Sequence, residues 1–332
     1  GIPHRVQTRC PLPLISMDQT TLIINRVLPI FLLIGIGYWI RRSSFLPEQT
    51  IDDLRKIVVN LALPSVLLIS FLGIELQPAY LLIFVTLFLV NVLLLILGRW
   101  LRVRLNIPHP YFPFLITGFE YGMLGVSLFG SAYGLENLGY IAVIDLGHEL
   151  FIWFVFLAFL LVRRDGLNRP GQLIGAFFRS PVIIGILAGL ILNLLGLRAW
   201  LYESAVTGGI MATLDFLSKL TIPSMLIIIG YSIRFDTSAV RAAGTVIGVR
   251  LALMLPVIAL LTAVLIRDLL NLDRGFEAAL FTLLILPPPF IVPLYMPTDQ
   301  PDERRYVNNV LMLHTVVSLA IFAVYFVINP TL

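Results

Sequence analysis

The sequence predicts an all-α polytopic membrane protein with ten transmembrane helices. These helices are expected to form two inverted five-helix repeats, in which the fourth and ninth helices are broken and cross. The first observation behind this prediction is the composition. Of 332 residues, 58% are hydrophobic and 13% are charged, whereas soluble domains carry about 25% charged residues. The second is the number of long apolar stretches, and the third is a pattern that the two halves of the chain share.

Ten apolar stretches approach the roughly 20 residues that a membrane span requires. They are separated by short loops, so residues 17–332 are expected to form a single membrane domain. The expected spans are 20–40, 54–72, 79–100, 111–134, 138–162, 181–197, 214–233, 240–266, 276–295 and 306–328. Residues 1–16 hold the only cysteine, Cys10, and lack the apolar core of a signal peptide. We interpret them as a leader or a cloning tag.

The ninth span contains three consecutive prolines, Pro287, Pro288 and Pro289. Proline lacks a backbone N–H group and cannot continue an α-helix, so this span is expected to break inside the membrane. Carbonyl groups freed by such a break are tolerated only within protein or against a polar cavity. Broken helices at the centre of transporters bind substrate, and a proline kink without a ligand is the alternative.

The two halves of the chain repeat. The nine residues from Leu61 share five identities with the nine from Leu220, and the same offset of 159 aligns Asn91 with Arg250. Other residues match in the same order at offsets of 152 and 166: Pro29 with Pro181, Gly37 with Gly189, Tyr140 with Tyr306, and His148 with His314. Each half has an odd number of spans, so the second half must cross the membrane in the opposite sense, which gives an inverted repeat.

The repeat partner of the ninth span is the fourth, which also contains helix-weakening residues. Gly118, Gly122 and Gly125 lie within eleven residues that also include Glu120 and Tyr121. Two broken helices are therefore expected to meet near the middle of the membrane. Half-helix N-termini there would offer partial positive charge to an anion, and C-terminal carbonyls would suit a cation.

Most arginines and lysines lie in the loops after the first, third, fifth, seventh and ninth spans, including the long basic loop 163–179. By the positive-inside rule, these loops are cytoplasmic. The protein is therefore expected to be a multi-pass protein of the cell membrane with both termini outside the cytoplasm. The basic isoelectric point has the same explanation, so no nucleic-acid partner is expected.

The chain resembles the auxin efflux carrier family over residues 27–328. The resemblance lies in the apolar run from Val27 to Tyr38, in Leu61 to Ser65, and in the glycine-rich stretch from Gly122 to Gly134. It implies a scaffold of helices over 20–72 and 181–233, which often forms a homodimer. It also implies moving transport helices over 79–162 and 240–328, in the crossed-helix arrangement of sodium/proton antiporters.

One position departs from the family pattern. Glu120 stands where the family often has asparagine at the crossing, and Ser127 stands where it has proline. An ionised Glu120 would repel an anion. Either Glu120 is protonated, or it is paired, or the substrate is not an anion.

Ionisable residues inside the membrane are candidates for function, because a charge at the bilayer centre costs about 2.5–3.5 kcal/mol on the lenient scale. Asp145, His148 and Glu149 share one helix face, and His148 with Glu149 could hold or relay a proton. Structural hydrogen bonding is the alternative. Arg250 lies deep in the eighth span and is expected to need a carboxylate partner, or to grip a substrate carboxylate.

Two sets of site residues follow. The predicted substrate-binding residues are Gly118, Glu120, Tyr121, Gly122, Arg250, Pro287, Pro288, Pro289 and Asn309. The predicted proton- or ion-coupling residues are Glu120, Asp145, His148, Glu149 and His314.

The predicted function is secondary transport, or uniport, of a small organic anion such as a monocarboxylate, a dicarboxylate or an auxin-like acid. Alternating access around the crossing would move the substrate, with protons or a monovalent cation as coupling partners. The chain has no nucleotide-binding phosphate loop, and no cofactor or metal is expected. A cation or proton antiporter is the near alternative. An intramembrane enzyme or sensor is less favoured, because no catalytic motif supports it.

Overall fold

A computed structural model of the protein describes residues 17–165, 170–233, 240–297 and 300–332. The regular structure in this part of the chain is entirely helical. Seven of its helical segments are long and apolar enough to cross a membrane. The prediction of an all-α membrane protein is therefore confirmed, whereas the predicted leader and Cys10 lie outside the described residues.

The seven long segments agree with seven predicted spans. They are α1 (Met17–Arg42), α2 with α3 (Glu48–Ile57, Leu63–Gly73), α4 (Ala79–Arg104), α7 with α8 (Leu138–Phe151, Leu157–Asp165), α12 (Ala205–Ser232), α13 (Val240–Leu260) with its π-helical continuation (Leu261–Leu269), and α15 (Pro301–Ile328). The other three predicted spans are shorter or broken. They contain α5 and α6 (Phe112–Leu115, Val126–Tyr133), α10 (Pro181–Leu194), and α14 (Arg274–Ile285).

Two segments differ from the sequence prediction. Residues 170–179, expected to be part of a loop, include the helix α9 (Pro170–Arg179), on which Phe177 packs against Trp153 and Phe154. Helix α12 begins at Ala205 rather than at residue 214, and a short helix, α11 (Arg198–Glu203), precedes it. Val206 is 74% exposed on the extra turns of α12, as expected for a side chain that faces lipid.

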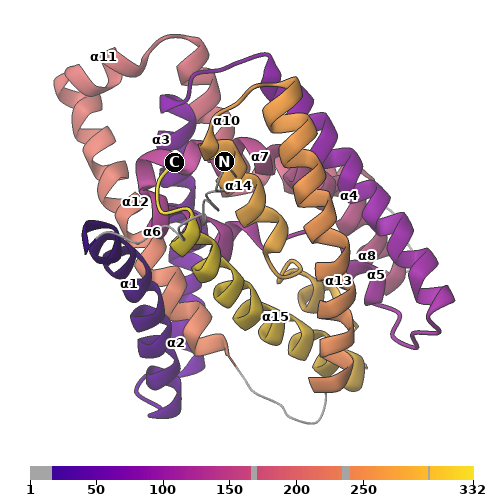
Figure 1. The fold of residues 1–332 in the computed structure, drawn as a ribbon. Coiled ribbons are helices and arrows are strands. Elements are labelled where there is room, and N and C mark those ends of the chain that lie inside the picture. Colours follow the sequence, from indigo (N-terminus) through magenta and orange to yellow (C-terminus); the bar gives the residue numbers. More distant parts are fainter. Residues whose placement is uncertain (1–16, 166–169, 234–239, 298–299) are drawn as a thin grey trace, which may run out of the picture.

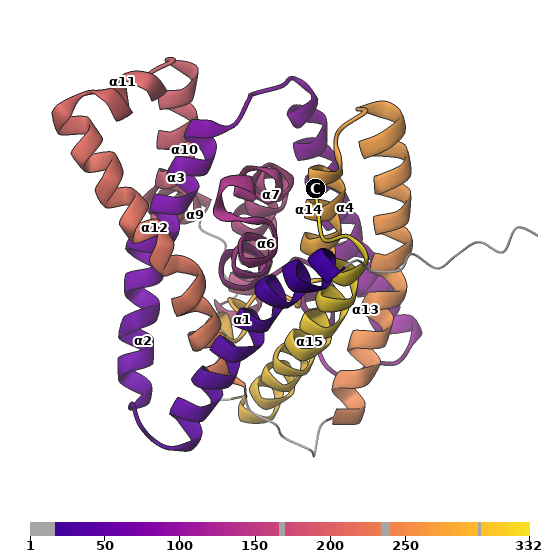
Figure 2. The same ribbon diagram turned by 60° about the vertical axis from the view of Figure 1, so that its left-hand side comes forward.

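The helices form two groups (Figures 1 and 2). In both views α2, α3 and α12 lie on one side, whereas α4 and α13 lie on the other, and α1 and α10 pack on the first set. In the first group, α1 packs on α12, and α3 packs on α10. A glycine allows the two helices of each pair to approach closely, because Gly37 faces the carbonyl of Ile227 and Gly189 faces the carbonyl of Leu68.

The second group surrounds the broken helices. There α7 packs on α4 and α14, and α13 packs on α15. Buried apolar residues on both sides of the breaks hold these helices together. Large apolar side chains on the outside, such as Leu81 and Leu93, are more than half exposed and form a surface suited to lipid. The two breaks are thus enclosed by protein.

Candidate functional site

The first break lies between α5 and a π-helical turn, η2 (Tyr121–Gly125), that leads into α6. Gly118 lies in this break with a positive φ of 70°, a conformation that side chains with a Cβ rarely adopt. A Cβ on Gly118 would also lie 2.9 Å from Cδ1 of Ile152 and 2.9 Å from Cγ of Pro289. Only glycine fits this position without displacement of its neighbours.

The second break follows α14, where Leu286 adopts an extended conformation and the three prolines continue the chain without helix. A 3₁₀ turn, η7 (Val292–Tyr295), comes next. The two breaks are in direct contact, because the backbone N–H of Glu120 donates to the carbonyl of Pro287 at 2.9 Å. The prolines and the glycine-rich stretch therefore meet, as the sequence predicted.

Glu120 accepts hydrogen bonds at the start of both resumed segments. Its Oε1 accepts from the N–H of Met123 at 3.3 Å, which caps η2, and its Oε2 accepts from the N–H of Phe290 at 2.6 Å, which precedes η7. No cationic side chain in the described part of the chain pairs with it. The carboxylate thus occupies the position that helix N-termini offer to an anion.

Arg250 binds the opposite ends of the broken helices. Its Nη1 donates to the carbonyl of Leu115 at 3.3 Å, and its Nη2 donates to the carbonyls of Gly118 at 2.5 Å and Leu286 at 2.9 Å. The guanidinium carbon also lies 4.9 Å from the ring centroid of Phe119. These carbonyls end the first halves of both helices and carry partial negative charge.

The expectation that Arg250 pairs with a carboxylate of the protein is therefore wrong for the described residues. Neither Glu120, Asp145 nor Glu149 pairs with Arg250 among the described residues, although its side chain is fully buried. The physical reason is that three carbonyls at two helix C-termini together supply the negative potential that one carboxylate would supply. Most of the guanidinium's donors are engaged, and only Nε has no hydrogen-bond partner within the described residues.

His148 is tied to the first break. Its Nε2 accepts from the N–H of Phe119 at 2.9 Å, and its Nδ1 lies 2.7 Å from Oδ1 of Asp145. An Nε2 that accepts a hydrogen bond carries no proton, so the proton lies on Nδ1 and is donated to Asp145. Glu149 accepts from the indole N–H of Trp153 at 2.9 Å and is not hydrogen-bonded to His148. That His148 and Glu149 hold or relay a proton stays a prediction.

Asp145, His148 and Glu149 each place a potential ligand atom within 4.8 Å of the other two. In this arrangement His148 has no free lone pair, because one ring nitrogen donates and the other accepts. Two carboxyl groups remain available for a proton or a small cation. The three residues do not form a ready zinc site, which requires a neutral histidine with a free lone pair.

Three other predicted site residues have buried polar atoms that lack hydrogen bonds. Both ring nitrogens of His314, Nδ2 of Asn309 and the hydroxyl of Tyr121 are buried without a hydrogen-bond partner within the described residues. Sequence reasoning missed Ser318, whose hydroxyl donates to the carbonyl of Ile285 at 2.7 Å. Its position four residues after His314 on one helix face was the available signal.

Two cavities lie between the two helix groups, at opposite ends of the bundle. The cavity at the basic end has a volume of about 580 Å³ and is lined by residues that include Arg55, Tyr231, Arg304, Asn309 and Met312.

The cavity at the opposite end has a volume of about 800 Å³. Four acidic and two basic side chains line it: Glu75, Glu136, Asp215, Asp273, Arg198 and Lys219. Each cavity is bordered by helices of both the first group, which contains α12, and the second group, which contains α14 and α15. The bundle therefore has a polar cavity toward each of its ends.

Comparison with protein families identifies a match. A family model described as membrane transport protein matches residues 22–326, which is nearly the whole chain. Comparison with curated proteins finds no match.

Proposed function

The chain belongs to the auxin efflux carrier family of membrane transport proteins, and we propose that it is a secondary transporter of a small organic anion. In this proposal the substrate binds at the contact between the two broken helices and moves together with a proton on Glu120. Mono- and dicarboxylates and auxin-like acids are the substrate class.

One observation carries the proposal. The Glu120 carboxylate accepts the N–H groups of Met123 and Phe290 and so fills the place that a substrate carboxylate would take. Protonation of Glu120 weakens its hold on these N–H groups, because a neutral carboxyl group accepts weaker hydrogen bonds than a carboxylate. The released groups then bind the substrate anion. Anion and proton are thereby bound together, and an ion gradient can drive transport.

Arg250 has a positioning role in this proposal. It was predicted to bind substrate, but the carbonyls of Leu115, Gly118 and Leu286 engage its Nη atoms. It holds the first halves of the two helices together while Glu120 exchanges partners. Substrate recognition then falls to the N–H groups near Glu120, with Gly122 and Met123 partly exposed beside them.

Alternating access is supported by the two cavities at opposite ends of the bundle. We propose that the helices over 79–162 and 240–328 move against the scaffold over 20–72 and 181–233. The contacts of Gly37 with Ile227 and of Gly189 with Leu68 support the two inverted five-helix repeats, since the offsets of 152 and 159 convert one contact into the other. The three shorter or broken spans complete the ten helices.

The membrane arrangement is part of the same proposal. The basic end of the bundle faces the cytoplasm, so both termini of the membrane domain lie outside the cytoplasm, in the cell membrane. The family resemblance supports a homodimer through the scaffold helices.

Exchange of a cation for protons is the second candidate function. It is favoured by the carboxyl groups of Asp145 and Glu149, which lie close together beside the crossing. In that case Glu120 would bind the cation or the proton, and no organic acid would be transported.

Uptake into proteoliposomes tests the proposal. Labelled mono- and dicarboxylates are offered with and without an inward proton gradient to the native chain, to Glu120→Gln, and to Glu203→Gln as an exposed control. We expect gradient-driven uptake by the native chain and the control, and loss of the gradient dependence in Glu120→Gln. Equal gradient dependence in all three would exclude Glu120 as the coupling group. Sodium- or potassium-driven proton movement without uptake of any acid would favour the second candidate.

A further inference from the structure

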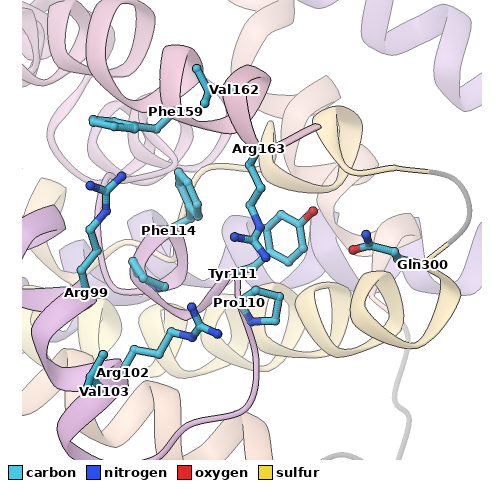
Figure 3. A pocket seen from close by; sticks show the side chains of 11 residues that line it. Arg99, Arg102, Val103, Pro110, Tyr111, Phe114, Phe159, Val162, Arg163 and Gln300 are labelled. Carbon is cyan, nitrogen blue, oxygen red and sulfur yellow. The ribbon is translucent and has the colours of Figure 1, made fainter. Parts of the chain in front are cut away.

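A third cavity lies away from the crossing, at the basic end of the bundle. It has a volume of about 630 Å³ and lies between the end of α4, the segment around Tyr111, and α8. Arg99, Arg102 and Arg163 line it, and none of its described lining residues is acidic. Figure 3 shows the arginines reaching the cavity from two sides, Arg99 and Arg102 from one helix and Arg163 from another.

Aromatic rings hold two of these arginines in place. The guanidinium carbon of Arg99 lies 4.1 Å from the ring centroid of Phe159, and that of Arg163 lies 5.0 Å from the ring centroid of Tyr111. A cation over a ring face uses no N–H donor, so the donors remain available to an anion. Nε of Arg102 is buried and has no hydrogen-bond partner in the described part of the chain. Three guanidinium groups with unused donors favour a ligand with phosphate oxygens.

The exposed residues at the edge of the cavity indicate that the phosphate belongs to a lipid. Val103 is 74% exposed, and Phe159 and Val162 are also exposed, so the cavity borders the apolar surface that faces lipid. Its arginines lie at the end of the bundle where lipid headgroups meet the cytoplasm in the orientation proposed above. Basic pockets between membrane helices on this side suit anionic headgroups.

We propose that this cavity binds the headgroup phosphate of an anionic phospholipid from the leaflet at the basic end. The acyl chains would lie against Val103 and Val162 on the outside of the bundle. The sequence pattern explains these arginines only as topology signals, which do not require them to converge on one cavity. The site is separate from Glu120 and does not depend on which substrate is transported.

The test compares lipid binding by two matched double variants of the full chain. Arg102→Gln/Arg163→Gln removes two charges from the cavity, whereas Arg42→Gln/Arg241→Gln removes two exposed charges at the same end of the bundle. Each detergent-purified protein is titrated with phosphatidylglycerol or phosphatidylcholine, and bound lipid is counted by native mass spectrometry. We expect the cavity variant to bind phosphatidylglycerol roughly ten- to thirtyfold more weakly, and the control to bind like the native chain.

Two results would overturn the proposal. One is equal phosphatidylglycerol binding by the two double variants, which would leave only general attraction to the basic end. The other is displacement of the lipid by inorganic phosphate at comparable concentration, which would assign the cavity to a free anion. If the double variant does not fold, Arg102→Gln alone is compared with Arg42→Gln, because Nε of Arg102 has no hydrogen-bond partner within the described residues. Weaker phosphatidylglycerol binding by Arg102→Gln is expected, and equal binding by the two single variants would overturn the proposal.

Discussion

At the residue scale, Glu120 and Arg250 bind different helix ends where the two breaks meet. Glu120 accepts from N–H groups at the start of both second halves, and Arg250 donates to carbonyls at the end of both first halves. Hydrogen bonds to a charged group contribute about 1.5–3 kcal/mol each. Two such bonds together contribute about 3–6 kcal/mol, which offsets the cost of about 2.5–3.5 kcal/mol for a carboxylate in the membrane. The proposed gain and loss of a proton at Glu120 requires that neither state be strongly favoured.

Replacement of Arg250 tests the carbonyl contacts. Arg250→Leu would leave three buried carbonyls without their donor, so we expect it to lower the free energy of unfolding by about 3–5 kcal/mol. The measurement is denaturant unfolding in detergent micelles.

A double-mutant cycle separates this account from an ion pair. Glu149→Gln combined with Arg250→Leu should give additive losses, because the two side chains do not pair in the structure. A strong rescue of Arg250→Leu by Glu149→Gln would instead show that an Arg250–Glu149 ion pair forms.

The sequence predicts where the two helices break, but not which groups the side chains at the breaks bind. Proline and glycine have backbone effects that sequence reveals, so the breaks at Pro287 and Gly118 could be located. The partners of Arg250 could not be found, because they are backbone carbonyls, which every residue carries and which become available only where a helix ends. The pairing of His148 with Asp145 rather than Glu149 depends on side-chain orientation, since both carboxylates lie within one helical turn of it.

At the element scale, glycines set the distance between paired helices of the scaffold. A Cβ on Gly37 would collide with the carbonyl of Ile227, whereas a Cβ on Gly35 would meet no atom within 4 Å. Sequence periodicity identified these helices but not their partners, because apolar side chains fit any apolar neighbour. The starts of α9 and α12 were also missed, since amphipathic and glycine-containing turns have little apolar signal.

Substitution of these two glycines tests the close approach. Gly37→Val should force α1 away from α12 and lower the free energy of unfolding by roughly 2–4 kcal/mol, whereas Gly35→Val should change it by less than about 0.5 kcal/mol. Thermal unfolding of both variants in the same detergent compares them. Equal effects of the two substitutions would contradict the pairing of α1 with α12.

At the scale of the whole molecule, two cavities at opposite ends of the bundle border both helix groups. A transporter needs its site to communicate with one side at a time, and movement of one group against the other would achieve this. In the proposed function, binding of the substrate and of the proton is linked, because both depend on the N–H groups that Glu120 occupies. By linkage, each one strengthens the binding of the other.

The most direct test is the pH dependence of substrate binding by the native chain and by Glu120→Gln. Isothermal titration calorimetry from about pH 5 to about pH 8 would use the carboxylate with the largest uptake. We predict that Kd of the native chain rises about tenfold per pH unit once Glu120 loses its proton, whereas Kd of the variant stays constant. An unchanged Kd in the native chain, or the same slope in both proteins, would contradict competition between Glu120 and the substrate for one site.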